Sequence, residues 1–456
     1  MAVATMVFIG AGSVVFTRNL VKDILTYPAL GDGEIVLMDI NLDRLAKIER
    51  LIGRLTEQQG SPVRVRATAD RRDALRGADY VIFTIQVGGV DQWAQDIEIP
   101  ARYGVSQCVG DTLGPGGIFR GLRHLAVLDD ALADMEELCP GATLLQYSNP
   151  MSILTWRACE SPVRTVGLCH SVQGTAAMLA RWCGVPKDEL VYWAAGINHQ
   201  AWYLTLRHGG KDLHPTLHQA VLNPGVVAEE PVRVELFERF AYFVTESSGH
   251  ASEYYPYFRK DDKAVAALSE RFRHAEPGVH EWLGFGKTGG CPTDARLREQ
   301  AYEDIVQRQI SGQEPIEVVR SQEYGLQIIN ALETGALVEV NANVANEDLI
   351  TNLPAGLCVE VPCLVSGDGV HPCHVGALPP QLAALNRASI SLQELALLAH
   401  KEADPELVFQ ALALDPLTAT CCTLDQIWAL GKEMLEANKG FLPQFGEQRR
   451  RPSWTS

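Results

Sequence analysis

A thiol and an imidazole that could hold a metal ion stand some thirty residues apart. Cys169 ends the apolar segment 163–169, and His199 follows the segment 191–197. Thiolate and neutral imidazole are common ligands of divalent transition metals. A closed structural zinc site is not expected, because only these two ligands are evident, and an incomplete shell leaves positions for substrate oxygens. Judged without wider context, the residues favour a buried thiol and a satisfied core histidine.

Two further stretches carry groups that could transfer protons. The glycine-dense stretch 110–117 contains the carboxylate of Asp111. The stretch 245–254 holds more polar groups than a turn requires, although either stretch could contain a helix cap or a turn. The candidates in the second stretch are Glu246, Ser247, His250 and Tyr254.

The first turn of the chain resembles a nucleotide-binding turn. Gly10, Gly12 and Ser13 follow an expected strand at 3–9 and open an expected helix at 14–27. Glycines there permit close approach of the backbone to a pyrophosphate, which would lie at the helix N-terminus. The signal is incomplete, because Val15 replaces the third glycine of the usual pattern. An unrelated glycine turn is the alternative.

Polar residues at the ends of later strands extend this nucleotide site. Asp39 ends the second expected strand, where a carboxylate accepts hydrogen bonds from a ribose and favours NAD over NADP. The nearby Arg44 weakens that preference. Gln86, Gly88 and Asn149 follow the next strands, at the edge where cofactor and substrate meet in a doubly wound sheet, or they are plain loop residues.

Strand and helix patterns alternate along the first part of the chain, which predicts an α/β fold. Residues 1–165 are expected to form an NAD-binding, Rossmann-like domain with a doubly wound parallel sheet. Beyond about Trp193 helices dominate, so residues 166–456 are expected to form an α+β catalytic and oligomerisation domain. The helices expected there include 231–244, 294–310 and 382–400, with short strands at 337–344 and 358–364.

Bulk composition excludes several classes of function. The net charge of −17 disfavours nucleic acid and anionic membranes as partners, because both need clustered lysine and arginine. The N-terminus lacks the pattern of a signal peptide, and no apolar run is long enough to span a bilayer. The eleven scattered cysteines indicate free thiols in a reducing compartment. A cytoplasmic location is expected.

Six stretches together resemble glycoside hydrolase family 4, and the resemblance spans nearly the whole chain. They are FIGAGSVVFTRNLVKDIL (8–25), QCVGDTLGPGGIFRGLR (107–123), YSNPMS (147–152), GLCHSVQGT (167–175), AGINHQAWYL (195–204) and YFVTESSGHASEY (242–254). The resemblance implies a redox-assisted elimination in place of the usual pair of carboxylates. NAD⁺ oxidises C3 of the sugar, a divalent metal, usually Mn²⁺, stabilises charge, a base removes the C2 proton, and an acid protonates the departing oxygen. Water then adds at C1 and NADH returns the hydride.

The resemblance also assigns residues to roles. It implies that Cys169 and His199 are the metal ligands. Asn149 is expected to contact sugar hydroxyls and Asn198 to orient the site. His170 is expected near the departing oxygen, with Asp111 as its rival. The base stays open among Glu246, Ser247, His250, Tyr254 and a metal-bound hydroxide.

The resemblance narrows the substrate to an unphosphorylated α-galactoside. Many relatives use an arginine for a 6-phosphate where this chain has Trp93, which can stack on a sugar but cannot pair with phosphate. An α-galacturonide or α-glucoside is the alternative. The pair Arg259 and Lys260 could bind a galacturonide carboxylate, but a solvated charge pair is the favoured interpretation.

Two hypotheses from other classes remain open at this point. A plain NAD-dependent 2-hydroxy acid dehydrogenase shares the first domain, but the pair Cys169 and His199 disfavours it. A nucleotide-sensing module needs no second polar cleft, and the stretch 245–254 disfavours it. The resemblance implies a homodimer or homotetramer with a small sugar as the substrate.

Overall fold

The computed structural model describes residues 4–273 and 286–446. Six parallel strands form the N-terminal half of its sheet in the order β3-β2-β1-β4-β5-β6. This is the strand order of a doubly wound dinucleotide-binding domain, as the alternating pattern predicts. Each strand is short, apolar and largely buried because helices cover both faces of a parallel sheet. The strands are β1 (Thr5–Ile9), β2 (Glu34–Met38), β3 (Arg64–Thr68), β4 (Tyr80–Phe83), β5 (Thr143–Gln146) and β6 (Arg164–Gly167).

Helices connect these strands, as parallel neighbours in a sheet require. Two of them flank the glycine-dense stretch 110–117, because α4 precedes it and α5 begins within it. The helices are α1 (Val14–Ile24), α2 (Leu42–Gln59), α3 (Arg71–Leu75), α4 (Gly89–Arg102), α5 (Gly114–Leu138), α6 (Met151–Cys159) and α7 (Ser171–Cys183).

The second half of the chain extends the same sheet. β10 pairs antiparallel with β6 through Asn343 and Gly167, and the order continues β10-β11-β7-β8-β9, with β12 on β11. The expected boundary between residues 165 and 166 falls within β6. The added strands are β7 (Val191–Ile197), β8 (Gln200–His208), β9 (Lys211–Asp212), β10 (Val338–Ala345), β11 (Cys358–Ser366) and β12 (Gly369–Pro372).

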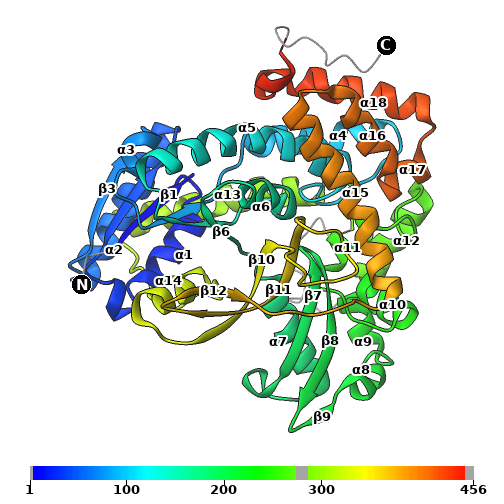
Figure 1. The fold of residues 1–456 in the computed structure, drawn as a ribbon, viewed down its shortest axis with the longest axis horizontal. Coiled ribbons are helices and arrows are strands. Elements are labelled where there is room, and N and C mark those ends of the chain that lie inside the picture. Colours follow the sequence, from blue (N-terminus) through cyan, green and yellow to red (C-terminus); the bar gives the residue numbers. More distant parts are fainter. Residues whose placement is uncertain (1–3, 274–285, 447–456) are drawn as a thin grey trace.

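Helices dominate this half, as predicted. Figure 1 shows α15, α16 and α18 at the upper right, beside α4 and α5, which they contact. The helices are α8 (His214–Ala220), α9 (Pro224–Glu229), α10 (Pro231–Phe240), α11 (Ser248–Tyr254), α12 (Asp262–Arg273), α13 (Gly290–Ile310), α14 (Gly325–Thr334), α15 (Pro380–Glu402), α16 (Pro405–Leu414), α17 (Pro416–Cys421) and α18 (Leu424–Asn438).

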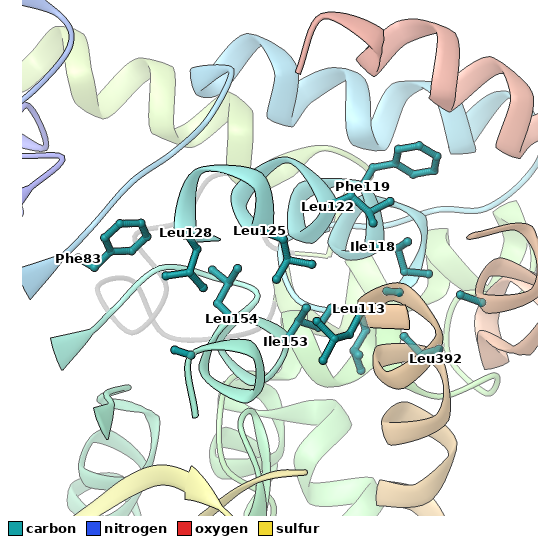
Figure 2. Packing of buried hydrophobic residues seen from close by; sticks show 14 of the residues in the cluster. Phe83, Leu113, Ile118, Phe119, Leu122, Leu125, Leu128, Ile153, Leu154 and Leu392 are labelled. Atoms are coloured by element: carbon teal, nitrogen blue, oxygen red, sulfur yellow. The ribbon is translucent and has the colours of Figure 1, made fainter. Parts of the chain in front are cut away.

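The long helix α5 runs through the main hydrophobic core. Figure 2 shows its side chains Leu125 and Leu128 facing Ile153 and Leu154 of α6. This burial fixes α5 firmly, and its glycine-rich first turn is buried as well. No helix among the described residues is long and apolar enough to cross a bilayer. All the cysteines are free thiols, as expected.

Candidate active site

The carboxyl ends of the parallel strands bring the predicted site residues to one edge of the sheet. A cavity of about 420 Å³ opens there. The residues that line it come from segments far apart in the sequence. They are Phe16, Val109, Asp111, Tyr147, Asn149, Met151, Leu168, Cys169, His170, His199, Glu229, Glu230, Glu246, Ser247, His250 and Cys291.

Cys169 and His199 meet in the wall of this cavity. The Cys169 Sγ lies 3.3 Å from the His199 Nε2. Cys169 follows β6, and His199 occupies the tight turn between β7 and β8 with a left-handed φ of 64°. A non-glycine residue adopts this backbone at a cost, which is typical of functional sites. The sequence predicted this pair, and the structure brings its side chains together.

Hydrogen bonds fix the orientation of the His199 ring. The Thr112 hydroxyl donates to the Asp111 carboxylate over 2.7 Å and lies 3.0 Å from the His199 Nδ1. Because that hydroxyl proton is committed to Asp111, Thr112 accepts from Nδ1–H. The lone pair of Nε2 therefore points toward Cys169, as a metal ligand requires.

Glu246, His250 and Asp111 form a buried chain of charges. The His250 Nδ1 lies 3.3 Å from the Glu246 Oε1, and the His250 Nε2 lies 3.5 Å from the Asp111 Oδ1. The Ser247 hydroxyl caps the first turn of α11 and lies 3.0 Å from the His250 Nδ1. The polar stretch 245–254 therefore supplies one wall of the cavity and is not merely a turn.

Electrostatics hold this chain in one protonation state. Burial opposes ionisation of Glu246, but the charge of His250 keeps the pKa of Glu246 well below its usual range. Burial also opposes ionisation of Asp111, whose pKa is nevertheless lowered by the hydrogen bond and charge of His250. The same carboxylates outweigh burial and raise the pKa of His250 well above its usual range. An imidazolium thus lies between two carboxylates.

Asn149 and His170 complete the polar lining. The Asn149 amide donates to the Asp111 Oδ2 over 2.9 Å. The His170 Nδ1 lies 3.3 Å from the Glu323 Oε1, and Glu323 raises the pKa of His170. The His170 side chain is 65% exposed, so solvent screens part of this effect.

The nucleotide turn lies against the Asp39 carboxylate. The Gly12 N–H donates to the Asp39 Oδ2 over 2.7 Å, and a Cβ on Gly12 would lie 2.6 Å from that oxygen. Ser13 begins α1 without a side-chain cap, so the first amides of the helix face outward for an anion. Arg44 forms an ion pair with Glu299. The Glu299 carboxylate offsets the positive charge of Arg44, which was expected to weaken the preference for NAD.

Other predicted cofactor residues lie beyond the neighbouring strands. Gly10 has a φ of 89°, and a Cβ there would lie 2.6 Å from the Thr84 carbonyl oxygen, so only glycine fits between these strand ends. Gly88 caps α4 with a φ of 82°, and Gln86 is exposed just before it.

Three predicted residues lie behind the cavity wall. The Trp93 indole donates to the Val109 carbonyl over 2.6 Å and its ring packs on Arg120, so its face is not presented to a sugar in this structure. Asn198 is 1% exposed, and its buried amide has no hydrogen-bond partner among the described residues. The Tyr254 hydroxyl lies 3.2 Å from the His199 Nδ1, so Tyr254 contacts a cavity residue from behind.

The interpretation of Arg259 and Lys260 as a solvated pair is wrong for Arg259. Its side chain is fully buried, and the guanidinium donates to the carbonyls of Ser106 and Gly286. These hydrogen bonds link the loop before Asp111, at Ser106, to Arg259 and to the segment at Gly286. Lys260 is exposed, and the two charges face different surroundings.

Sequence reasoning missed several residues that shape the site. Thr112 orients His199, Glu323 pairs with His170, and the Tyr324 hydroxyl lies within 3.2 Å of the backbone N and O of Cys169. A threonine in a glycine loop and a Glu-Tyr pair before a helix carry no distinctive spacing. Only the folded chain shows their partners.

Several donor groups fit a divalent cation. The ligand atoms of Cys169, His199 and Glu246 lie within 4.8 Å of one another, as do those of Asp111, His199 and His250. Burial, then the charge of Glu246, raises the pKa of Cys169, so a nearby cation would favour the thiolate. A site made of sulfur and imidazole nitrogen does not select Mn²⁺ over zinc. The supply of each metal therefore decides which ion occupies the site.

Curated relatives match over nearly the whole chain. The α-galactosidase of Rhizobium meliloti is 38% identical over 98% of this chain and 90% of its own length. The α-galactosidase of Bacillus subtilis is 38% identical over 96% of this chain and 99% of its own length. An α-galacturonidase of Thermoanaerobacterium saccharolyticum is 30% identical over 96% of both.

Solved structures and family models agree with these relatives. A provisionally named glucosidase from Bacillus subtilis superposes with a TM-score of 0.84 at 26% identity, covering 95% of this chain and 99% of its own. A 6-phospho-α-glucosidase from gut microorganisms, in complex with NAD and Mn²⁺, shares the fold at a TM-score of 0.80 and 19% identity, covering 97% and 100%. Models of the family 4 glycosyl hydrolases and of their C-terminal domain match residues 5–185 and 194–418. The chain belongs to glycoside hydrolase family 4.

Proposed function

We propose that the protein is an NAD- and Mn²⁺-dependent α-galactosidase that cleaves unphosphorylated α-galactosides. The observation that carries the proposal is the contact of Cys169 with His199, 3.3 Å apart, in the cavity beyond the nucleotide turn. The full-length likeness to α-galactosidases supports the substrate class. Such a site suits a sugar whose C2 proton must be made acidic.

The chain supplies distinct groups to hold the dinucleotide, the metal and the sugar. Gly10, Gly12 and the N-terminus of α1 would hold a pyrophosphate, and Asp39 would accept from a ribose hydroxyl. Cys169 and His199 would hold the metal. When bound, NAD supplies a hydride acceptor and the metal a Lewis acid at the sugar's C2 and C3 oxygens. Asn149, whose amide lies on the cavity wall, would bind a sugar hydroxyl.

His170 is the acid of this proposal. It lines the cavity, and Glu323 stabilises its protonated form, so it can donate a proton to the departing oxygen. Asp111 is a weaker candidate for this role because its two oxygens accept from Thr112 and Asn149 and its pKa is low. The group that delivers the proton should be one that is protonated in the resting enzyme.

The lining favours a neutral sugar. Among the described residues that line the cavity there is no lysine or arginine. Phosphate and carboxylate groups on C6 are normally met by such cations. An uncharged C6 hydroxyl, as in a galactoside, therefore fits this cavity better than a 6-phosphate or a galacturonide.

We also propose a cytoplasmic homodimer or homotetramer. The free thiols, including the proposed ligand Cys169, suit a reducing compartment.

A single assay tests the proposed function. p-Nitrophenyl α-galactoside is offered with NAD⁺, Mn²⁺ and a thiol reductant, and each is omitted in turn. Cleavage without net NADH is expected, and it should fall by at least about tenfold without NAD⁺ or metal. Net NADH formed from a hydroxy acid, or cleavage indifferent to NAD⁺, would contradict the proposal. p-Nitrophenyl α-galacturonide is the matched control for the C6 group and should react more slowly.

A further inference from the structure

We propose that Glu246 is a third protein ligand of the divalent cation, beside Cys169 and His199. The inference rests on the proposed function, because it takes a metal at that pair as given. It goes beyond it by assigning a carboxylate that the sequence motifs suggested only as a base. Its consequence is a metal held by three groups of the chain before any sugar arrives.

The donor atoms converge on one point of the cavity wall. The Glu246 Oε2 lies 3.4 Å from the His199 Nε2, and the Cys169 Sγ lies 3.3 Å from the same nitrogen. All the donor atoms of this triple lie within 4.8 Å of one another. Ligands that share a cation with bonds of about 2.0–2.3 Å show such separations. Each residue comes from a different segment, so the convergence is a tertiary feature.

The Glu246 Oε2 finds no hydrogen-bond donor in the neighbouring His199. Because Nδ1–H of His199 donates to Thr112, the Nε2 atom carries a lone pair. The Glu246 Oε2 is also an acceptor and lies only 3.4 Å from that nitrogen, so two acceptor atoms are in contact with no proton of His199 between them. A cation between them turns this unfavourable arrangement into a favourable one.

The other oxygen of Glu246 is anchored in the manner of a metal-bound carboxylate. Oε1 accepts from the Ser247 N–H over 3.0 Å and lies 3.3 Å from the His250 Nδ1. Such contacts orient a ligand from behind and leave the second oxygen free. Glu246 also has a left-handed φ of 68°, as His199 has at 64°, so both side chains are presented by strained backbone.

The alternative triple of Asp111, His199 and His250 is less suited to a cation. Asp111 uses one oxygen for Thr112 and the other for Asn149. His199 belongs to both triples, and its Nδ1–H already donates to Thr112. Three ligands at the Glu246 triple would instead leave open positions toward the cavity for two sugar oxygens.

Metal binding measured without substrate tests the inference. Enzyme freed of metal by a chelator and kept reduced is titrated with Mn²⁺, and free Mn²⁺ is followed by its electron paramagnetic resonance signal. Glu246→Gln should weaken Mn²⁺ binding by at least about tenfold, and Cys169→Ser should do the same. Glu323→Gln is the matched control, because it removes one negative charge beside His170 without removing a ligand. Its affinity should stay within about threefold of the parent's.

Cobalt provides a second readout. The sulfur-to-Co²⁺ charge-transfer band should persist in Glu246→Gln and vanish in Cys169→Ser, whereas the ligand-field bands should shift in both. NAD⁺ affinity reports that each variant is folded. Should Glu246→Gln fail to fold, Glu246→Asp, whose shorter chain draws the carboxylate back, takes its place and should also bind Mn²⁺ more weakly.

The outcomes separate this inference from the proposed function. Parent-like Mn²⁺ affinity and ligand-field bands in the Glu246 variant, with binding lost in Cys169→Ser, would overturn the third ligand and keep the metal site. Parent-like affinity in Cys169→Ser, or no Mn²⁺ binding by the parent enzyme, would overturn both.

Discussion

Single residues around the cavity act through partners that lie far away in the sequence. His199 depends on Thr112 for its tautomer, and His170 depends on Glu323 for its charge. The residue types at positions 199 and 170, with the neighbouring thiol, are enough to indicate metal and proton chemistry from the sequence alone. Their partners could not be predicted, because a threonine or glutamate gains its role only from a contact across the fold.

A buried carboxylate away from the cavity gives the folded protein a pH dependence. Asp415 is fully buried, caps α17 through Thr418, and has a pKa raised to about 6, chiefly by burial. The folded state therefore binds the proton more tightly than the unfolded chain, whose aspartates titrate near about 4. Stability from this group is fully present below about pH 4 and is lost as the pH rises through about 6.

Asp415→Asn should remove this dependence while keeping the helix cap. Urea unfolding of the two proteins is compared at about pH 4.5 and about pH 7. Relative to the variant, the parent should lose about 2 kcal/mol of unfolding free energy between these values. Parallel pH profiles for the two proteins would show that Asp415 does not titrate in this range.

At the scale of elements, the loop before α5 is fixed from two sides. Glu253 of α11 accepts hydrogen bonds from the backbone N–H groups of Cys108, Val109 and Gly110. From the other side the first turn of α5 packs on Thr112, where a Cβ on Gly117 would lie 2.3 Å from the carbonyl carbon. The position of Asp111 thus depends on a close approach that only glycine allows.

Gly117→Ala should displace the loop and disturb the hydrogen bonds of Asp111 and Thr112. We expect kcat to fall at least about tenfold and stability to fall by about 1–3 kcal/mol, as overpacking costs. Gly53→Ala is the control, because it lies in an exposed turn of α2 with open space around it and favours the helix. Equal activity in the Gly117 variant would mean that the loop position does not matter for turnover.

The sequence predicted most of the parallel half because its apolar segments alternate with helical patterns. Helix α4 is not evident from the sequence for a physical reason. Its buried face includes the polar residues Gln92 and Asp96, which weaken the apolar period. Their partners are Arg123 of α5 and Asn438 of α18, and Asn438 lies more than 300 residues away. Buried polar pairs of this kind cannot be recognised from local spacing.

At the scale of the whole molecule, one sheet carries both halves of the site. The narrow junction of β6 with β10, at Gly167 and Asn343, places the turn after β7 next to the end of β6. The sequence indicated a helix-rich second domain but not this junction, because a pairing across 176 residues leaves no local pattern. The sheet thereby brings the side chains of Cys169 and His199 into contact. The proposed chemistry depends on this contact.

Isotope incorporation at one carbon atom tests this account most directly. Methyl α-galactoside is hydrolysed in D₂O with NAD⁺, Mn²⁺ and reductant, and the released galactose is analysed by NMR. Elimination through loss of the C2 proton predicts deuterium at C2 of the product, since water and a solvent proton add afterwards. Galactose released with its C2 hydrogen fully retained would contradict redox-assisted elimination and leave an ordinary displacement at C1.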